Sequence, residues 1–286
     1  MNIAFLCKYC GQVNRGAEVY VAELSKHLSA LGHNVNIYQD IFSDIESKTQ
    51  IIISTNGRLD AILSKMWCLF HGAKLIISGQ AGLGWDDKLN LWVFPDVFVG
   101  LTEYQCRWAR KVNPFVKVIK IPNGVDLDKF NPKVKPIKID LPRPVILNVG
   151  EVLAFKRQQL LLQAAKKIKA SILLVGKGGD MNFNHQDMPK VYTACDLFSY
   201  PTSPEESFGI AIIEAMACGL PVVATDDPIR REIVEEAGLF VDPDDTEKYA
   251  QTLQQALAIK WGNKPLQQAS KFAWSNIAAA YEKIFI

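Results

Sequence analysis

The chain has 286 residues, 49% of them hydrophobic and 22% charged, a composition typical of a globular protein with a substantial core. The net charge of +2 argues against a nucleic-acid-binding protein. The first residues lack the basic start and cleavage site of a signal peptide, and no apolar run reaches the ~18 residues that a membrane span requires. Six cysteines, mostly in apolar segments, favour free thiols and a cytoplasmic protein over a disulfide framework.

Short apolar runs alternate with helical patterns through the first half of the chain. A strand at 2–7 precedes a helix within 15–32, where Val19, Leu24 and Leu28 recur near helical spacing. Near-continuous apolar runs suit parallel strands that are covered on both faces. Further strands are predicted at 34–39, 50–56, 73–79 and 96–102.

A proline-rich stretch, 122–144, separates this half from a second set of alternating elements and is predicted to be a linker. We therefore expect domains at 1–125 and 126–286, with the C-terminal helix, about residues 270–286, free to pack back on the first domain. The predicted fold is α/β, with two Rossmann-like doubly wound domains that face an interdomain cleft. The second domain is predicted to hold strands at 145–150, 171–178, 197–202, 221–226 and 238–243 and helices at 157–168 and 208–218.

The segment SPEESFGIAIIEAMACG (203–219) places acids before a helix of small and apolar residues and one further acid inside it. It follows a predicted strand, so it lies at the carboxyl end of a sheet, where ligands of doubly wound domains bind. Gly209 allows close approach to the backbone, and the free N–H groups of the first turn favour a phosphate. Glu206 and Glu214 would flank that phosphate, with Glu214 able to accept hydrogen bonds from a ribose. The alternative is an ordinary amphipathic helix with one surface glutamate.

The same segment, read through to Thr225, resembles the signature of the retaining glycosyltransferases of family 4, which have the GT-B fold and an E-x7-E pair. Four more stretches agree with this family in order and spacing, although the N-terminal loop alone is weakly specific. They are RGAE (15–18), IPNGVDLDKF (121–130), LNVG…FKR (147–157) and MPKVYTACDLFSYPT (188–202).

The resemblance implies roles for individual residues. Glu206 would contact the transferred sugar, Glu214 the nucleotide ribose and Lys156 the diphosphate, because the leaving group gains charge as the glycosidic bond breaks. Similar enzymes use side chains and a helix N-terminus in place of a metal, so neither metal nor cofactor is expected. The remaining implied donor-binding positions are Gly150, Arg157, Ser207, Phe208, Gly209 and Ile210.

The sequence departs from the family pattern in two places. Glu151 stands where the family usually has an arginine, so one diphosphate cation is missing or comes from Arg157. The region 77–88 lacks the histidine that many relatives have near the reacting sugar. The residues proposed for the acceptor side are Gln80, Trp85 and Asp86, together with Gly11 and Gly16 of the glycine-rich loop.

Other motifs were weighed as alternatives. The loop 11–18 lacks the Lys-Ser/Thr of a P-loop, and no G-x-G-x-x-G follows a strand, which argues against an NTPase and a dehydrogenase. Cys7 and Cys10 form a CxxC without a second pair, and the adjacent acids Asp86 and Asp87 are expected to be solvated rather than to bind a metal. The basic stretch 107–120 is expected to be a helix–strand unit with a basic outer face, contact with an anionic membrane being the alternative.

The predicted function is transfer of a sugar, with retention, from a nucleotide diphosphate sugar to an unidentified carbohydrate, lipid-linked or small-molecule acceptor. The rival interpretations are a sugar-nucleotide epimerase or phosphorylase on the same fold, and a non-enzymatic sugar-nucleotide binder or partner subunit. The last is motivated by Glu151, the absent histidine and the short first domain.

Overall fold

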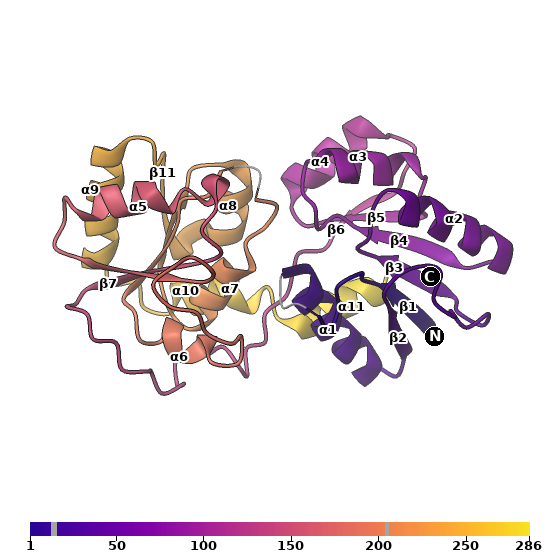
Figure 1. Ribbon diagram of the computed structural model, residues 1–286, viewed down its shortest axis with the longest axis horizontal. Helices are drawn as coiled ribbons and strands as arrows, with labels where there is room; N and C mark the ends of the chain where they lie inside the picture. The colour runs from indigo at the N-terminus through magenta and orange to yellow at the C-terminus, as the bar shows by residue number, and fades with distance from the viewer. Residues whose placement is uncertain (13–15, 204–205) are drawn as a thin grey trace. The chain divides into compact units, whose positions relative to one another are not determined.

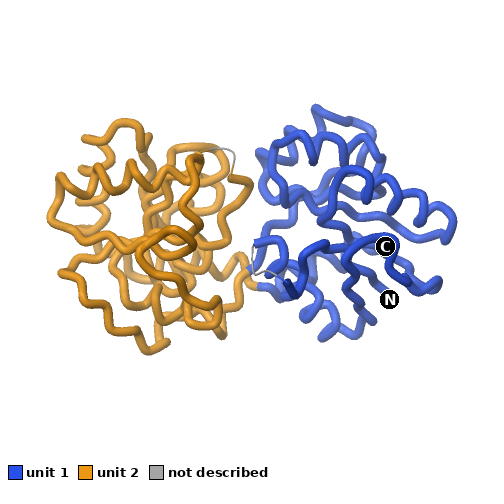
Figure 2. Tube along the Cα trace, in the orientation of Figure 1, with its two compact units in different colours: residues 1–124, 274–286 blue, residues 125–273 orange. Residues whose placement is uncertain are grey.

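The computed structural model describes residues 1–12, 16–203 and 206–286. Arg15 of the RGAE motif and Pro204 and Glu205 of the acidic motif lie outside these residues. The chain forms two compact units, residues 1–124 with 274–286 (unit 1) and residues 125–273 (unit 2) (Figure 2). The division falls one residue from the predicted domain boundary, and the C-terminal helix belongs to unit 1.

Unit 1 is built on a six-stranded sheet with strand order β2-β1-β3-β4-β5-β6, and all its pairs are parallel (Figure 1). The four strands predicted after the first helix form close to their expected positions, and a short sixth strand follows α4. The elements of unit 1 are β1 (Asn2–Leu6), α1 (Gly16–Ala30), β2 (Asn34–Tyr38), β3 (Ile51–Ser54), α2 (Leu59–His71), β4 (Lys74–Ser78), α3 (Trp85–Trp92), β5 (Val97–Gly100), α4 (Glu103–Val112), β6 (Val118–Lys120) and α11 (Trp274–Glu282).

Helices cover both faces of this sheet, which explains why its strands are nearly uniformly apolar. On one face, Ile3 and Phe5 of β1 pack with α1 and with Trp274 and Tyr281 of α11. On the other face, the alternate residues of β1 pack with helices α2, α3 and α4. Helices α2, α3 and α4 therefore share one side of the sheet, and their outer surfaces face away from it.

Unit 2 repeats the plan with a five-stranded parallel sheet in the order β11-β10-β9-β7-β8. Two parallel sheets flanked by helices confirm the predicted fold class, two Rossmann-like α/β domains. The elements of unit 2 are β7 (Val145–Val149), η1 (Ala154–Lys156), α5 (Gln158–Ala165), β8 (Ser171–Val175), α6 (Met188–Tyr192), β9 (Leu197–Tyr200), α7 (Ile210–Ala217), β10 (Val222–Thr225), α8 (Pro228–Val234), η2 (Glu235–Ala237), β11 (Gly238–Val241), α9 (Thr246–Ala258) and α10 (Lys264–Ser270).

The proline-rich stretch 122–144 is not a free linker, which corrects the sequence-based prediction. From Val125 onward it belongs to unit 2, where Val125 and Phe130 are each only 2% exposed. The backbone N–H of Val125 donates to the carbonyl of Phe272 at 2.8 Å. Apolar side chains between the prolines thus attach the stretch to unit 2, and proline density alone did not reveal this.

Asp87 is buried, contrary to the expectation that Asp86 and Asp87 are both solvated. It is 1% exposed, and its carboxyl oxygens lie 3.3 Å from Asn90 Nδ2 and 3.3 Å from Gln105 Nε2. Burial raises the pKa of Asp87 to about 7, because its charged form loses hydration that these amide contacts replace only in part.

Asp87 should make unit 1 less stable as the pH rises. The folded-state pKa of about 7 lies above the ordinary value of 3.8, so the stabilising protonated form is lost between those values as the pH increases. In Asp87→Asn, the free energy of unfolding relative to the unmodified protein should rise by about 2–3 kcal/mol from pH 5 to pH 8, because roughly two units of the pKa difference fall in this range at about 1.4 kcal/mol each. Urea unfolding at several pH values measures this. Asp86→Asn is the control, and parallel pH profiles for Asp87→Asn and the unmodified protein would contradict the prediction.

Candidate functional site

Two side chains of unit 2 meet at the carboxyl end of its sheet. Lys156 ends the short helix η1 after β7, and Glu206 lies in the loop after β9. Lys156 Nζ forms an ion pair and hydrogen bond with Glu206 Oε2, and the two side chains are 14% and 18% exposed. The two residues predicted to be catalytic, 50 positions apart, are therefore brought into direct contact.

Tyr200, the last residue of β9, completes this cluster. Its hydroxyl lies 3.2 Å from Lys156 Nζ, which also sits 5.3 Å from the centre of the tyrosine ring. Burial and the neighbouring Glu206 raise the pKa of Tyr200 well above its usual range, so the phenol keeps its proton. The cluster therefore holds one cation, one carboxylate and one neutral hydroxyl.

Gly209 fits helix α7 closely against this cluster. Its φ of 92° is a left-handed conformation that favours glycine, and a Cβ atom there would lie 2.9 Å from the Tyr200 ring. Helix α7 therefore begins at Ile210, two residues after the predicted start. The side chain of Phe208, 1% exposed, packs edge-on against Phe272 and anchors the entry to the helix.

Glu214, the second acid of the motif, is 6% exposed inside α7. Its Oε1 lies 2.7 Å from His185 Nε2, and its Oε2 accepts a hydrogen bond of 2.8 Å from the Tyr192 hydroxyl. Both carboxylate oxygens thus have a protein partner. The partner of Oε2, Tyr192, is buried, whereas the side chain of His185, the partner of Oε1, is 29% exposed. Oε1 is therefore the oxygen on the side nearer to solvent.

The partners of His185 define which of its nitrogens carries the proton. Lys129 Nζ lies 2.9 Å from His185 Nδ1, and an ammonium can only donate. The Nδ1 atom must therefore accept, so that Nε2 carries the proton and donates it to Glu214. Lys129 thus donates to His185, and His185 donates to Glu214. Of these three residues, the sequence predicted only Glu214 as part of the site.

Arg230 of α8 is a second residue that sequence reasoning missed. It is fully buried, and its guanidinium donates to Thr202 Oγ1 at 2.7 Å and to the Ser203 carbonyl at 3.0 Å. Asp227, the N-cap of α8, lies 3.4 Å from it. Arg230 therefore fixes the start of the loop that carries Glu206. An arginine in the first turn of a helix, after an Asp-Pro cap, is the only signal the sequence offered.

The remaining predicted donor-side residues lie around the same edge of the sheet. Gly150, with φ of 149°, follows β7, and the nearest atom to a Cβ placed there would be Lys156 Cε at 3.7 Å. The Arg157 guanidinium donates to the Pro201 carbonyl at 2.8 Å and pairs with Asp244 at 3.0 Å. Ser207 and Ile210, both partly exposed, flank the entry to α7.

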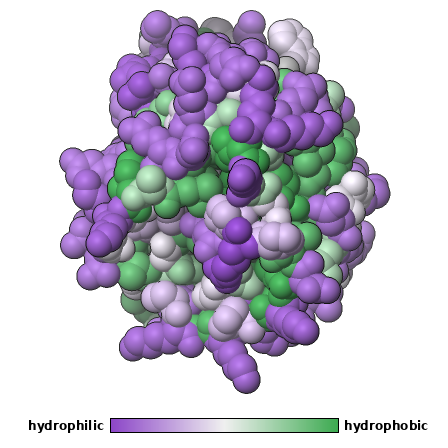
Figure 3. All heavy atoms as spheres, turned by 90° about the vertical axis from the view of Figure 1, so that its left-hand side faces the viewer, coloured by the Kyte–Doolittle hydropathy of each residue, from purple (hydrophilic) through white to green (hydrophobic). Residues whose placement is uncertain are grey.

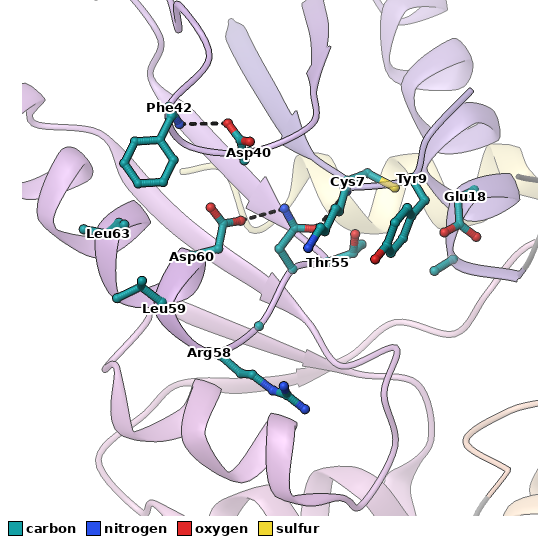
Figure 4. Close-up of a pocket in the computed structure, with 14 residues that line it drawn as sticks. Cys7, Tyr9, Glu18, Asp40, Phe42, Thr55, Arg58, Leu59, Asp60 and Leu63 are labelled. Atoms are coloured by element: carbon teal, nitrogen blue, oxygen red, sulfur yellow. Dashed lines mark hydrogen bonds between the residues drawn. The ribbon is translucent and has the colours of Figure 1, made fainter. Parts of the chain in front are cut away.

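Unit 1 has a pocket of about 510 Å³ at the carboxyl ends of β1 and β3, which the sequence did not predict (Figure 4). Leu59, Leu63 and Phe42 lie on one side of it and Tyr9 and Glu18 on the other. Glu18 is 8% exposed, and its Oε2 has no hydrogen-bond partner among the described residues. A buried acceptor without a partner beside a pocket is suited to bind a ligand hydroxyl.

The predicted acceptor-side residues do not line this pocket. Gln80 exchanges amide hydrogen bonds with Asn123 at 3.0 and 3.3 Å. Asp86 pairs with Arg58, a pocket residue, at 2.7 Å, and Trp85 is 68% exposed. Gly11 and Gly16 are exposed on either side of residues 13–15.

The first cysteine of the CxxC, Cys7, is buried in unit 1, and Cys10 is partly buried. Burial raises the pKa of the Cys7 thiol to about 11, which disfavours the reactive thiolate. Within residues 1–12, 16–203 and 206–286, no three His, Cys, Asp or Glu side chains gather in a way that would hold a metal ion. In the same residues, no helix is long and apolar enough to cross a membrane.

The sequence of unit 2 is similar to known glycosyltransferases. Residues 143–258 match the family described as Glycosyl transferases group 1. O-antigen chain mannosyltransferase B of Escherichia coli is 38% identical over 96 residues, which are 32% of this chain and 25% of that protein. D-inositol 3-phosphate glycosyltransferase of Corynebacterium jeikeium is 26% identical over 212 residues, 58% of this chain and 50% of that protein. The matches thus span half or less of these two relatives.

Solved structures share the fold over the whole chain. HepE of Anabaena in complex with UDP has a TM-score of 0.79 and 16% identity, with 99% of both chains covered. A glycosyltransferase of Rickettsia africae has a TM-score of 0.79 and 19% identity, covering 99% of this chain and 97% of that one. WaaG, a glycosyltransferase involved in lipopolysaccharide biosynthesis, has a TM-score of 0.69 and 15% identity, covering 100% and 99%. These proteins establish the two-domain GT-B fold for this chain.

Arg230 should be far more important to stability than its neighbour Arg231. Arg230→Ala leaves Asp227 and Thr202 buried without their partner, which typically costs about 3–5 kcal/mol. Arg231 pairs with Asp226 on the surface, where both side chains are more than 40% exposed, so that Arg231→Ala should cost no more than about 1 kcal/mol. Chemical denaturation of both variants measures the difference; equal losses would contradict the assigned role of Arg230.

Proposed function

We propose that this protein is a retaining glycosyltransferase of family 4 that transfers a sugar from a nucleotide diphosphate sugar to a separate acceptor. The observation that carries the proposal is the contact of Lys156 with Glu206 beside Gly209 and α7, with Glu214 buried farther along the same helix. The similarity of residues 143–258 to glycosyltransferases group 1 and the fold shared with HepE in complex with UDP-glucose support it.

Lys156 would exchange partners when the donor binds. Its ammonium pairs with Glu206 here, and a diphosphate carries more negative charge than one carboxylate. In the donor complex, Lys156 would bind the diphosphate, together with the first backbone N–H groups of α7. Glu206, released from the lysine, would then accept hydrogen bonds from the sugar hydroxyls. One ion pair thereby supplies both donor-binding groups.

The proposed reaction is a front-face substitution at the anomeric carbon. The acceptor oxygen forms its bond to that carbon while the bond to the β-phosphate oxygen breaks, and the departing phosphate takes the acceptor proton. Lys156 and the N-terminus of α7 would stabilise the charge that develops on the leaving diphosphate, and Glu206 would hold the sugar without forming a covalent intermediate. No metal or cofactor takes part in this proposal.

Glu214 would bind the ribose on the side now occupied by His185. Tyr192 retains Oε2 from within the core, so the ribose hydroxyls would compete with His185 for Oε1. His185 would then either move away or add a second contact to the nucleoside. It is therefore a positioning residue for the carboxylate in the absence of the donor.

The pocket of unit 1 is the proposed acceptor site. Carbohydrates and other polyols offer hydroxyls for the unpaired Glu18 oxygen and apolar ring faces for Tyr9 and Phe42.

All six cysteines are free thiols, which supports a reducing cytoplasmic setting.

Glu206→Ala should lower kcat by about 10²–10³-fold, because a contact to the reacting sugar is lost. The assay measures product formation from UDP-, GDP- and ADP-sugars with an acceptor panel, after a thermal-shift screen has identified the donor. Glu206→Gln keeps the size of the side chain, and Glu236→Ala, whose side chain is 86% exposed, is the matched surface control. Near-normal turnover in folded Glu206→Ala would refute the assignment. Donor binding without any transfer would favour the non-enzymatic alternative.

A further inference from the structure

Exposed apolar side chains are distributed unevenly between the two units. Among the described residues, every large hydrophobic side chain that is more than 60% exposed belongs to unit 1. In unit 2, the most exposed of them, Met181, reaches only 46%. Figure 3, which views the molecule from the side of unit 2, shows that face covered mostly by hydrophilic residues, with hydrophobic ones between them. Such a concentration on one unit indicates an interaction surface.

Helix α2 carries the largest group of these exposed apolar side chains. Its buried residues Ala61, Ser64 and Cys68 face the sheet at spacings of three and four. A second apolar stripe at the same spacings lies on its outer side and faces water. The exposed members of this outer stripe are Leu59 (64%), Ile62 (48%), Met66 (48%), Leu69 (70%) and Phe70 (82%). Helix α2 is therefore apolar on both sides, although only one side packs against the core.

Helix α3, on the same side of the sheet, has an outer stripe with two tryptophans. Trp85, Leu89 and Trp92 recur at helical spacing and are 68%, 38% and 51% exposed. The two helices are linked where α2 begins, through the ion pair of Arg58 with Asp86 at 2.7 Å. Tryptophan is the residue most characteristic of the interface between a bilayer and water. We call the two outer stripes together the α2–α3 apolar surface.

The segment of the chain that carries this surface has a positive net charge. Residues 57–120, which hold α2, α3 and α4, contain nine basic and five acidic residues, whereas the rest of the chain contains 23 basic and 25 acidic ones. One of the five acids, Asp87, is buried and so adds little charge to the surface. The positive excess of the protein therefore lies in the segment that exposes the apolar stripes, as expected for contact with anionic headgroups.

We propose that the α2–α3 apolar surface inserts into the headgroup region of an anionic lipid bilayer and that the neighbouring pocket of unit 1 takes the polar head of a lipid-borne acceptor. Leu59 belongs to both features, since it opens the stripe of α2 and lines the pocket. The second part of the proposal rests on the proposed glycosyltransferase function, and the first part does not. Membrane contact was the alternative interpretation of the basic stretch 107–120. In this proposal the stretch supplies basic residues, and the apolar side chains come from α2 and α3.

A bilayer explains the surface better than a protein partner does. Stable protein interfaces are depleted of lysine at their core, whereas Lys88 lies 5.4 Å from the Trp85 ring within this surface. A lysine beside a tryptophan can reach the phosphates while the ring occupies the interface. A second copy of this chain would instead place equal positive charges opposite each other, since a symmetric interface pairs the same patch.

Leu69→Gln with Phe70→Gln tests this surface, because both side chains are exposed and glutamine favours helix formation. Cosedimentation should show that the unmodified protein binds vesicles of phosphatidylcholine containing phosphatidylglycerol better than vesicles of phosphatidylcholine alone. The double variant should bind at least about tenfold more weakly, equivalent to about 1.4 kcal/mol. Leu162→Gln with Met181→Gln, which removes exposed hydrophobic side chains from unit 2, is the matched control and should bind as the unmodified protein does.

Trp92→Gln provides a second variant on α3, and circular dichroism confirms that each variant is folded. Absence of vesicle binding by the unmodified protein, or equal binding by the double variant, would overturn the proposal. A dimer in solution that the double variant dissociates would also overturn it, in favour of a second copy. Thermal shifts with donor sugars, measured without vesicles, test the proposed function separately. Vesicle binding without donor binding would refute the function and leave the membrane surface intact.

Discussion

The ion pair between Lys156 and Glu206 is the interaction on which the proposed donor site depends. It joins the loop after β7 to the loop after β9, two neighbouring strands of one parallel sheet. The hydroxyl of the buried Tyr200 contacts Lys156, and the buried guanidinium of Arg230 holds the Ser203 carbonyl at the start of the loop that carries Glu206. Such a pair is only moderately stabilising by itself, because removing two charges from water costs much of what their attraction returns. A diphosphate can therefore displace the carboxylate without a large loss in free energy.

The fold could be predicted because each of its elements has a local signal in the sequence. The strand runs around Ile52, Ile76 and Leu147 are almost uninterrupted apolar segments, and both faces of these strands are buried as the pattern requires. The structural role of the proline-rich stretch 122–144 could not be read as well. Val125 and Phe130 bury themselves between prolines, and the contacts that hold them come from residues far along the sequence, such as Phe272.

The site could be predicted only as far as it follows a contiguous motif. Glu206, Gly209 and Glu214 stand within nine positions, and Lys156 was placed by resemblance. His185, Tyr192 and Arg230 come from other elements and reach the motif only through tertiary contacts, so that spacing carries no trace of them. The burial of Glu18 and Asp87 was hidden for a similar reason, since an acid looks the same in the sequence whether or not distant parts of the chain cover it. The outer stripe of α2 was also overlooked, because its apolar residues are indistinguishable in sequence from a core face.

The most direct test is a crystal structure of the full chain with a nucleotide diphosphate sugar, chosen by thermal shift. The account predicts that Lys156 Nζ leaves Glu206 for the diphosphate, that Glu206 contacts the sugar, and that the ribose hydroxyls lie within hydrogen-bond distance of Glu214. A donor bound elsewhere, with Lys156 still paired to Glu206 and His185 still bonded to Glu214, would contradict it.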